Sequence, residues 1–337
     1  MDAIATQERL ARSVASWCPG ATGVTALARL SGGASQETWS FDIAHPAGAI
    51  GAILRRAPDG YGAASGRACG LETEAALMRR AQAAGVPAPL VLHVLLEDDG
   101  LGIGFIMARI DGETIPRKIL RDAAFADIRP KLAHQAGGIL AGIHSLPIDE
   151  LPELRRMDAA TEIDELAEDI TGFAQPRPVF QLALRWLRDN DPGPGDRITL
   201  VHGDFRHGNL MIGTNGIRAV LDWELAHHGD PMEDLGWICV NSWRFGEIDK
   251  PVGGFGSRED LFAGYAAASG IAVDPERVTF WEVMGTLRWG VMCCGMMQRF
   301  RDGPDHSLER AMIGRRSSET EIDLLRLLAP RGAPDAG

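Results

Sequence analysis

The chain has 337 residues, of which 45% are hydrophobic and 24% charged, and its formal net charge is −12. These proportions are typical of a soluble globular protein, and the length suits two lobes with a cleft between them better than one ordinary core. The acidic balance argues against nucleic acid as a partner, and no apolar run is long enough to cross a membrane.

The N-terminal third is predicted to be a small sheet with one helix inserted. A short amphipathic helix is expected over residues 5–17, without the apolar core of a secretion signal, so a cytoplasmic location is expected. Alternating and apolar runs then predict strands near 24–30, 37–43, 49–56, 90–96 and 104–109, with a helix over 67–84 between the third and fourth.

A glycine-rich segment separates the first two strands. Ser31, Gly32, Gly33 and Ser35 are small residues whose backbone can approach phosphates and donate N–H groups to them. Such a run more commonly forms a glycine-rich hairpin turn. Its place before the strand that carries Arg55 favours phosphate binding.

The rest of the chain is predicted to be mainly helical. Apolar residues recur at three- and four-residue spacing over 127–144, and further helices are expected at 162–173, 179–189, 258–268, 275–301 and 307–328. The segment DNDPGPGD at 189–196 is interpreted as a loop inside this region.

The stretch LVHGDFRHGNLM, followed by AVLDWE, carries the chemistry. Asp204 is the candidate general base, and Asn209 and Asp222 are candidate ligands for the Mg²⁺ that neutralises a nucleotide triphosphate. NLMI and RAVL predict two strands joined by a TNG turn, which would bring Asn209 and Asp222 together. His202 is expected to brace this loop by a hydrogen bond. The alternative without a catalytic role is a polar loop with one capping Asp.

HGDFRHGN, LDWE and GDPMEDLG together resemble the aminoglycoside phosphotransferase family, within the protein-kinase-like superfamily that includes choline and homoserine kinases. The resemblance runs from about Val24 to about Leu328. It is strongest to bacterial phosphotransferase-family proteins and to the kinase-like part fused to acyl-CoA dehydrogenases. It implies an α+β, protein-kinase-like two-lobe fold: residues 1–110 as a nucleotide-binding lobe with a five-stranded antiparallel sheet, and 111–337 as a helical catalytic and substrate lobe. ATP and Mg²⁺ are the implied cofactors.

The resemblance also assigns residues of the first lobe. Protein kinases carry a phosphate-binding lysine on the third strand, whereas this chain offers Arg55, whose guanidinium keeps the charge but differs in reach. Glu74 is the candidate helix partner of Arg55, and Glu72 is the alternative. For either residue, the non-functional interpretation is a position on a solvated helix face. Backbone groups from Met107 to Arg109 are expected to bind adenine at the hinge between the lobes.

Residues for the acceptor are less well indicated. Asp230 and Asp234 are expected to hold backbone N–H groups. Glu224, Asp305 and Arg288 are possible substrate contacts, and several tryptophans could form an aromatic wall, although tryptophans on helices are mostly core residues.

Three functions remain open. The first is an ATP-dependent kinase of a small-molecule hydroxyl (aminoglycoside-like, amino-alcohol or hydroxyacyl), acting without nucleic acid or membrane as a monomer or homodimer. The second is a nucleotide-binding regulatory protein without catalysis. A protein kinase is disfavoured because the sequence has no DFG or APE motif.

Overall fold

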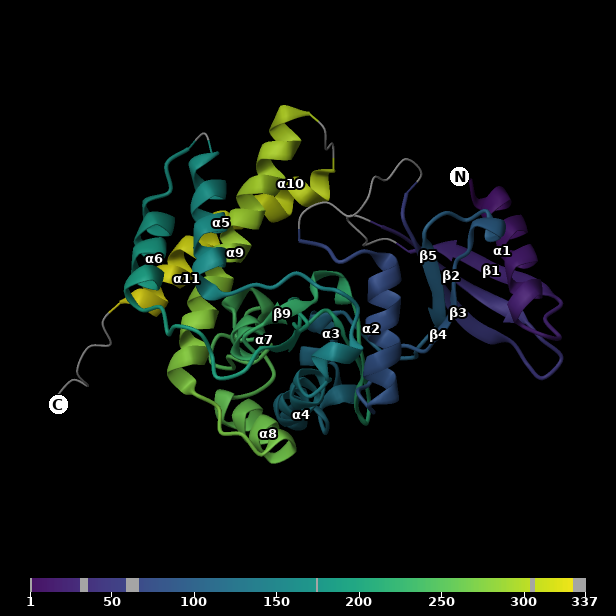
Figure 1. Cartoon of the computed structure of the whole chain (residues 1–337), viewed down its shortest axis with the longest axis horizontal. Coiled ribbons are helices and arrows are strands. Elements are labelled where there is room, and N and C mark those ends of the chain that lie inside the picture. Colours follow the sequence, from purple (N-terminus) through teal and green to yellow (C-terminus); the bar gives the residue numbers. More distant parts are fainter. Residues whose placement is uncertain (1, 31–35, 59–66, 174, 304–306, 330–337) are drawn as a thin grey trace.

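The computed structural model describes residues 2–30, 36–58, 67–173, 175–303 and 307–329. They form two lobes (Figure 1), with the sheet at one end and helices α5, α6, α9, α10 and α11 at the other. The glycine-rich residues Ser31, Gly32, Gly33 and Ser35 lie outside the described residues, as does Asp305.

The smaller lobe contains the predicted five-stranded antiparallel sheet, which is confirmed. Its strands are β1 (Gly23–Arg29), β2 (Glu37–Ala44), β3 (Ile50–Arg56), β4 (Val91–Val94) and β5 (Gly104–Ala108), in the order β1-β2-β3-β5-β4. Helix α1 (Ala3–Trp17) precedes the sheet, and α2 (Leu71–Ala83) lies between β3 and β4. The predicted start of α2 at residue 67 is wrong because Gly70 has φ 84°, which is not a helical angle.

The two faces of the sheet pack against different partners. Successive side chains of a strand point to opposite faces. On β5, Ile106 joins the core formed with α1, whereas Phe105 joins the core shared by α2 and the larger lobe. On β3, Leu54 packs with α1, so the next side chain, Arg55, points to the side of α2 and the larger lobe. This alternation decides which of the two adjacent arginines reaches the space between the lobes.

The larger lobe is mainly helical, as predicted. Its helices are α3 (Pro116–Arg121), α4 (Leu132–His144), α5 (Ala159–Thr171), α6 (Pro178–Asp189), α7 (Met232–Trp237), α8 (Arg258–Ser269), α9 (Pro275–Asp302), α10 (Leu308–Gly314) and α11 (Ser317–Leu328). Its short strands are β6 (Thr199–Val201), β7 (Leu210–Gly213), β8 (Gly216–Val220) and β9 (His227–Gly229). Strand β6 pairs with β9, and β7 forms a hairpin with β8.

Helices α4 and α8 cross at close range. A Cβ on Gly137 would lie 2.1 Å from the Leu261 carbonyl oxygen, and one on Gly264 would lie 2.0 Å from that of His134. Only glycine fits at both positions, so this crossing depends on two residues that do not favour a helix in isolation.

The single helix predicted over 307–328 is wrong, because the structure has α10 and α11 with a break at Arg315 and Arg316. A Cβ on Gly314 would lie 3.0 Å from the Cys293 carbonyl oxygen on α9. The end of α10 therefore presses against α9, and the chain turns there so that Thr320 and Leu324 of α11 are buried. Among the described residues, no helix is both long and apolar enough to cross a membrane.

Candidate active site

The loop after β6 is fixed from below by Asp234 of α7. The two carboxylate oxygens of Asp234 accept the backbone N–H groups of His202, at 2.8 Å, and Gly203, at 3.0 Å. Gly203 has φ 78°, and a Cβ there would lie 2.5 Å from the Leu225 carbonyl oxygen. A buried carboxylate and a required glycine together set the path of the chain into Asp204.

The Asp204 carboxylate accepts hydrogen bonds on both oxygens. Its Oδ2 accepts from the amide nitrogen of Asn209 at 2.6 Å, and its Oδ1 accepts from Trp237 and Arg206, each at 2.9 Å. His202 lies beneath, and its Nδ1 accepts the backbone N–H of Asp204 at 3.2 Å. Burial lowers the pKa of His202, which keeps the ring neutral. This geometry supports a bracing role for His202.

Asn209 and Asp222 lie at the same end of the β7–β8 hairpin. The Leu221 N–H donates to the Asn209 carbonyl at 2.8 Å, so the two residues are neighbours across the strand pair. Asp222 has φ 65° and ψ 64°, a left-handed conformation that is uncommon outside glycine and concentrates at functional sites. Burial alone would raise the pKa of Asp222, but the contact with Arg55 outweighs it and holds the pKa below its usual value.

Arg55 extends from β3 into a group of three carboxylates. Its nitrogens lie 2.5 Å from Asp222 Oδ1, 3.2 Å from Glu74 Oε2 and 3.4 Å from Glu224 Oε2. Glu74 on α2 is buried and also accepts the Trp223 N–H at 3.3 Å. Burial raises the pKa of Glu74 to about 7, although Arg55 opposes this rise. The charge of Arg55 therefore sits beside the hairpin end that carries Asp222.

The alternatives to Arg55 and Glu74 lie elsewhere. Arg56 is buried on the opposite side of β3, where it contacts Glu37 at 2.5 Å and donates to the Leu101 carbonyl at 3.2 Å. Glu72 is exposed on α2. The structure thus brings Arg55, rather than Arg56, to Glu74 and Asp222.

Two of the backbone N–H groups that were expected to bind adenine at the hinge are already hydrogen-bonded within the protein. Met107 lies in β5, and the N–H groups of Ala108 and Arg109 donate to the carbonyls of Leu90 and Gly51. The Arg109 side chain pairs with Asp42 at 2.8 Å. Those two amides are therefore engaged in the sheet, and adenine binding near Met107 to Arg109 stays a prediction.

The donor set fits Mg²⁺. The Asn209 amide nitrogen donates to both the carbonyl and the carboxylate of Asp204, which leaves its side-chain oxygen as the group that a cation could use. With the ionised Asp222, this makes one carboxylate and one amide oxygen. Mg²⁺ is commonly held by one or two carboxylates together with substrate phosphates and water.

A cavity of 340 Å³ opens beside the loop after β6, between α5 and α9. Its apolar lining includes Met157, Leu166, Phe173, Val291 and Met296, and its basic lining consists of Arg67, Arg155, Arg288, Arg299 and His227. Gly203, Leu225 and Trp237 form the end that adjoins Asp204. Of the four arginines, the sequence indicated only Arg288, because the others come from segments without a motif.

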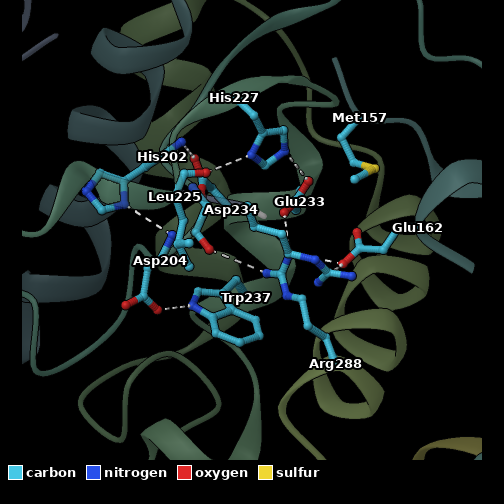
Figure 2. A network of polar contacts seen from close by, with 12 residues as sticks. Met157, Glu162, His202, Asp204, Leu225, His227, Glu233, Asp234, Trp237 and Arg288 are labelled. Atoms are coloured by element: carbon cyan, nitrogen blue, oxygen red, sulfur yellow. Dashed lines mark hydrogen bonds and ion pairs between the residues drawn. The ribbon is translucent and has the colours of Figure 1, made fainter. Parts of the chain in front are cut away.

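A buried ionic network lies under the loop (Figure 2). Arg288 of α9 contacts Glu233 at 2.7 Å and Glu162 at 3.2 Å, and Glu233 also contacts His227 at 3.0 Å. His227 and Arg288 outweigh the effect of burial and lower the pKa of Glu233 to about 2. Burial likewise opposes the charge on His227, but Glu233 raises the pKa of His227 above its usual value.

This pair predicts a pH-dependent stability. Because the pKa of His227 is higher in the folded protein, its stabilisation is fully present below about pH 6.5, the unfolded value, and is lost as the pH rises through the folded pKa. We expect the free energy of unfolding in urea to fall by about 1–3 kcal/mol over that rise. His227→Gln should remove most of the fall, and His228→Gln should leave it in place. An unchanged pH profile in His227→Gln would contradict this assignment.

The phosphotransferase enzyme family model matches residues 26–271 of the chain. Among curated proteins, acyl-CoA dehydrogenase family member 10 of Mus musculus is 28% identical over 237 residues, covering 65% of this chain and 20% of that protein. Member 11 of Gallus gallus is 24% identical over 311 residues, covering 82% of this chain and 36% of that protein. The chain therefore spans about a third or less of the length of these relatives.

Solved structures share the fold at low sequence identity. A protein from Ralstonia eutropha that is described as an aminoglycoside phosphotransferase has a TM-score of 0.73 at 18% identity, covering 95% of this chain and 97% of that one. A choline/ethanolamine kinase family protein from Mesorhizobium loti has a TM-score of 0.64 at 22% identity, covering 96% of each chain. An aminoglycoside phosphotransferase in a ternary complex with AMP-PNP and hygromycin B has a TM-score of 0.62 at 17% identity, covering 97% of this chain and 99% of that one.

Proposed function

The chain belongs to the phosphotransferase enzyme family of small-molecule kinases, and from this premise we propose that it transfers the γ-phosphate of ATP to a hydroxyl of a small molecule. The observation that carries the proposal is the convergence of four side chains on one place. Asn209 lies 2.6 Å from the Asp204 carboxylate, and Arg55 lies 2.5 Å from Asp222. A candidate base, two candidate metal ligands and a candidate phosphate-binding cation thus meet between the lobes.

Each residue has a distinct part in the proposed reaction. Asp204 orients the acceptor hydroxyl and takes its proton as the hydroxyl oxygen bonds to the γ-phosphorus and the bond to the β–γ bridging oxygen breaks. Arg55 binds the phosphates, and Glu74 holds Arg55 in place. Asn209 and Asp222 would hold Mg²⁺, which neutralises charge on the phosphates when it is bound.

The cavity beside Asp204 supports an acyl acceptor with an anionic group. Its wall is mostly apolar. Three of its four arginines, Arg67, Arg155 and Arg288, are paired with carboxylates, whereas Arg299 has no ion pair among the described residues. The charge of Arg299 would repel a polycationic aminoglycoside and attract the negative group of an apolar chain. The names of the relatives, acyl-CoA dehydrogenase family members, agree with a hydroxyacyl compound. Aminoglycoside-like and amino-alcohol acceptors are the competing outcomes of the test.

The test is a panel of acceptors incubated with the protein and MgATP. Aminoglycosides, amino alcohols, sugars and hydroxyacyl-CoA thioesters are compared, and products are identified by mass spectrometry. We expect a gain of one phosphate on a hydroxyacyl compound, abolished by EDTA. MgATP binding without any phosphorylated product would instead favour the regulatory alternative. The specific feature that supports this alternative is Arg55, which stands where protein kinases have a lysine.

A charge change in the cavity separates the acceptor classes. Arg299 lines the cavity and is exposed, so Arg299→Ala should raise the KM for an anionic acceptor about tenfold with little change in kcat. Arg301→Ala, on the same helix but outside this cavity, is the matched control and should leave KM within twofold. A lower KM for a cationic acceptor in Arg299→Ala would point to the aminoglycoside class.

We further propose that the protein acts in the cytoplasm, as a monomer or homodimer. Neither feature enters the chemistry, because every proposed site residue belongs to one chain.

A further inference from the structure

The indole of Trp237 contacts the candidate base directly. Its Nε1–H donates to Asp204 Oδ1 at 2.9 Å, from helix α7, and the side chain is buried. Figure 2 shows the indole between Asp204 and Arg288. No motif in the sequence marked this contact, since tryptophans on helices are mostly core residues.

Trp237 is itself held on its other side. The guanidinium of Arg288 lies 4.2 Å from the centre of the indole ring, a cation–π arrangement. Arg288 is held in turn by Glu233 and Glu162 on α7 and α5, and all three side chains are buried. Three helices therefore fix the plane of the ring that bonds to Asp204.

The hydrogen bonds to Asp204 leave one acceptor site open. A carboxylate offers about four lone-pair sites, two on each oxygen. Trp237 and Arg206 occupy both sites of Oδ1, and the Asn209 amide occupies one site of Oδ2. The remaining site of Oδ2 is the one that an acceptor hydroxyl can use. Trp237 also lines the cavity, so the residue that donates to Oδ1 borders the proposed acceptor space.

We propose that Trp237 is a positioning residue of the phosphotransfer reaction: its indole N–H, held by Arg288, fixes the Asp204 carboxylate so that Oδ2 faces the acceptor hydroxyl. This inference rests on the assignment of Asp204 as the base. It predicts that the N–H group, and not only the ring, is needed, because the ring alone would preserve the stacking on Arg288 but release the carboxylate.

The kinetic test makes the same change at two neighbouring tryptophans. Trp237→Phe removes the N–H but keeps a ring, and Trp243→Phe does the same at a buried ring 5.2 Å away whose Nε1 has no hydrogen-bond partner among the described residues. Hydrolysis of MgATP, with water as the acceptor, should slow about tenfold or more in Trp237→Phe with the Kd for MgATP within twofold. Trp243→Phe should stay within twofold in both. Equal losses in the two variants would overturn the proposal.

Two further measurements separate the inference from the proposed function. In ¹H–¹⁵N spectra of the indole groups, Asp204→Ala should shift the Trp237 signal much more than the Trp243 signal, and an unmoved Trp237 signal would overturn the contact. The double variant Asp204→Ala/Trp237→Phe should hydrolyse ATP no more slowly than Asp204→Ala alone. If Asp204→Ala keeps full activity, the base assignment fails; if it loses activity while Trp237→Phe keeps it, only the role of Trp237 fails.

Discussion

Replacing Asp204 with alanine should slow phosphoryl transfer about 10²–10⁴-fold, the range typical of a removed general base. The acceptor hydroxyl would lose the group that orients it and takes its proton. Asn209 and Asp222 would remain, so the Kd for MgATP should change less than about fivefold, a limit we set from the loss of one hydrogen bond of Asn209. Single-turnover rates with saturating MgATP measure the chemical step, and nucleotide titration measures binding.

Asp204→Asn refines the same experiment. An asparagine keeps an oxygen that can accept the Trp237 and Arg206 hydrogen bonds, but its amide nitrogen cannot accept from Asn209, and it lacks the charge and basicity of the carboxylate. Its activity should be close to that of Asp204→Ala, while its thermal stability stays nearer to that of the wild type. Asp249→Ala, at an exposed position, is the control for unspecific effects. A variant of Asp204 with more than a tenth of wild-type activity would contradict the role of base.

The parts of the fold that the sequence predicted are those with a local signal. The β7–β8 hairpin has two short apolar runs around a TNG turn, and its strands overlap the predicted runs 209–212 and 218–221, although β8 already begins at Gly216 of the expected turn. The five strands of the sheet have clear alternation or apolar runs. The partnership of Arg55 with Glu74 was expected from the resemblance, and the 3.2 Å contact agrees with it.

The parts that the sequence missed depend on tertiary packing. Helix α7 has six residues, too few to show a helical period, so the direction of Trp237 toward Asp204 had no sequence signal. The cavity arginines Arg67, Arg155 and Arg299 come from three distant segments that meet only in the folded chain. The break between α10 and α11 follows from the approach of Gly314 to α9, which a continuous apolar pattern does not reveal.

The second prediction with a large effect concerns Arg55, which stands where protein kinases have a lysine. Arg55→Met should lower kcat/KM for MgATP about 10²–10³-fold, because the phosphates lose their cation. It should also lower the free energy of unfolding by about 3 kcal/mol at pH 8, since Glu74 is left buried without its partner. Steady-state kinetics and urea unfolding measure the two effects separately.

The loss of stability should depend on pH in a defined direction. Burial already raises the pKa of Glu74 to about 7 in the presence of Arg55, which opposes the rise, so the pKa rises further in Arg55→Met. A carboxyl whose pKa is higher in the folded than in the unfolded chain destabilises the fold increasingly as the pH rises above about 4.5, the unfolded value. The part of the stability gap that comes from Glu74 should therefore be small near pH 5 and larger at pH 8, and it adds to the loss of the Asp222 contact, which is already present at pH 5.

A double variant separates the loss of activity from the loss of stability. Arg55→Met/Glu74→Gln removes the buried charge together with its partner, so it should regain most of the lost stability at pH 8 while remaining as inactive as Arg55→Met. Arg55→Lys should keep more activity than Arg55→Met, because an ammonium can still bind phosphate as a point charge. If Arg55→Met binds and turns over MgATP like the wild type, the three-carboxylate contact of Arg55 is only structural, and the phosphates are held by other groups.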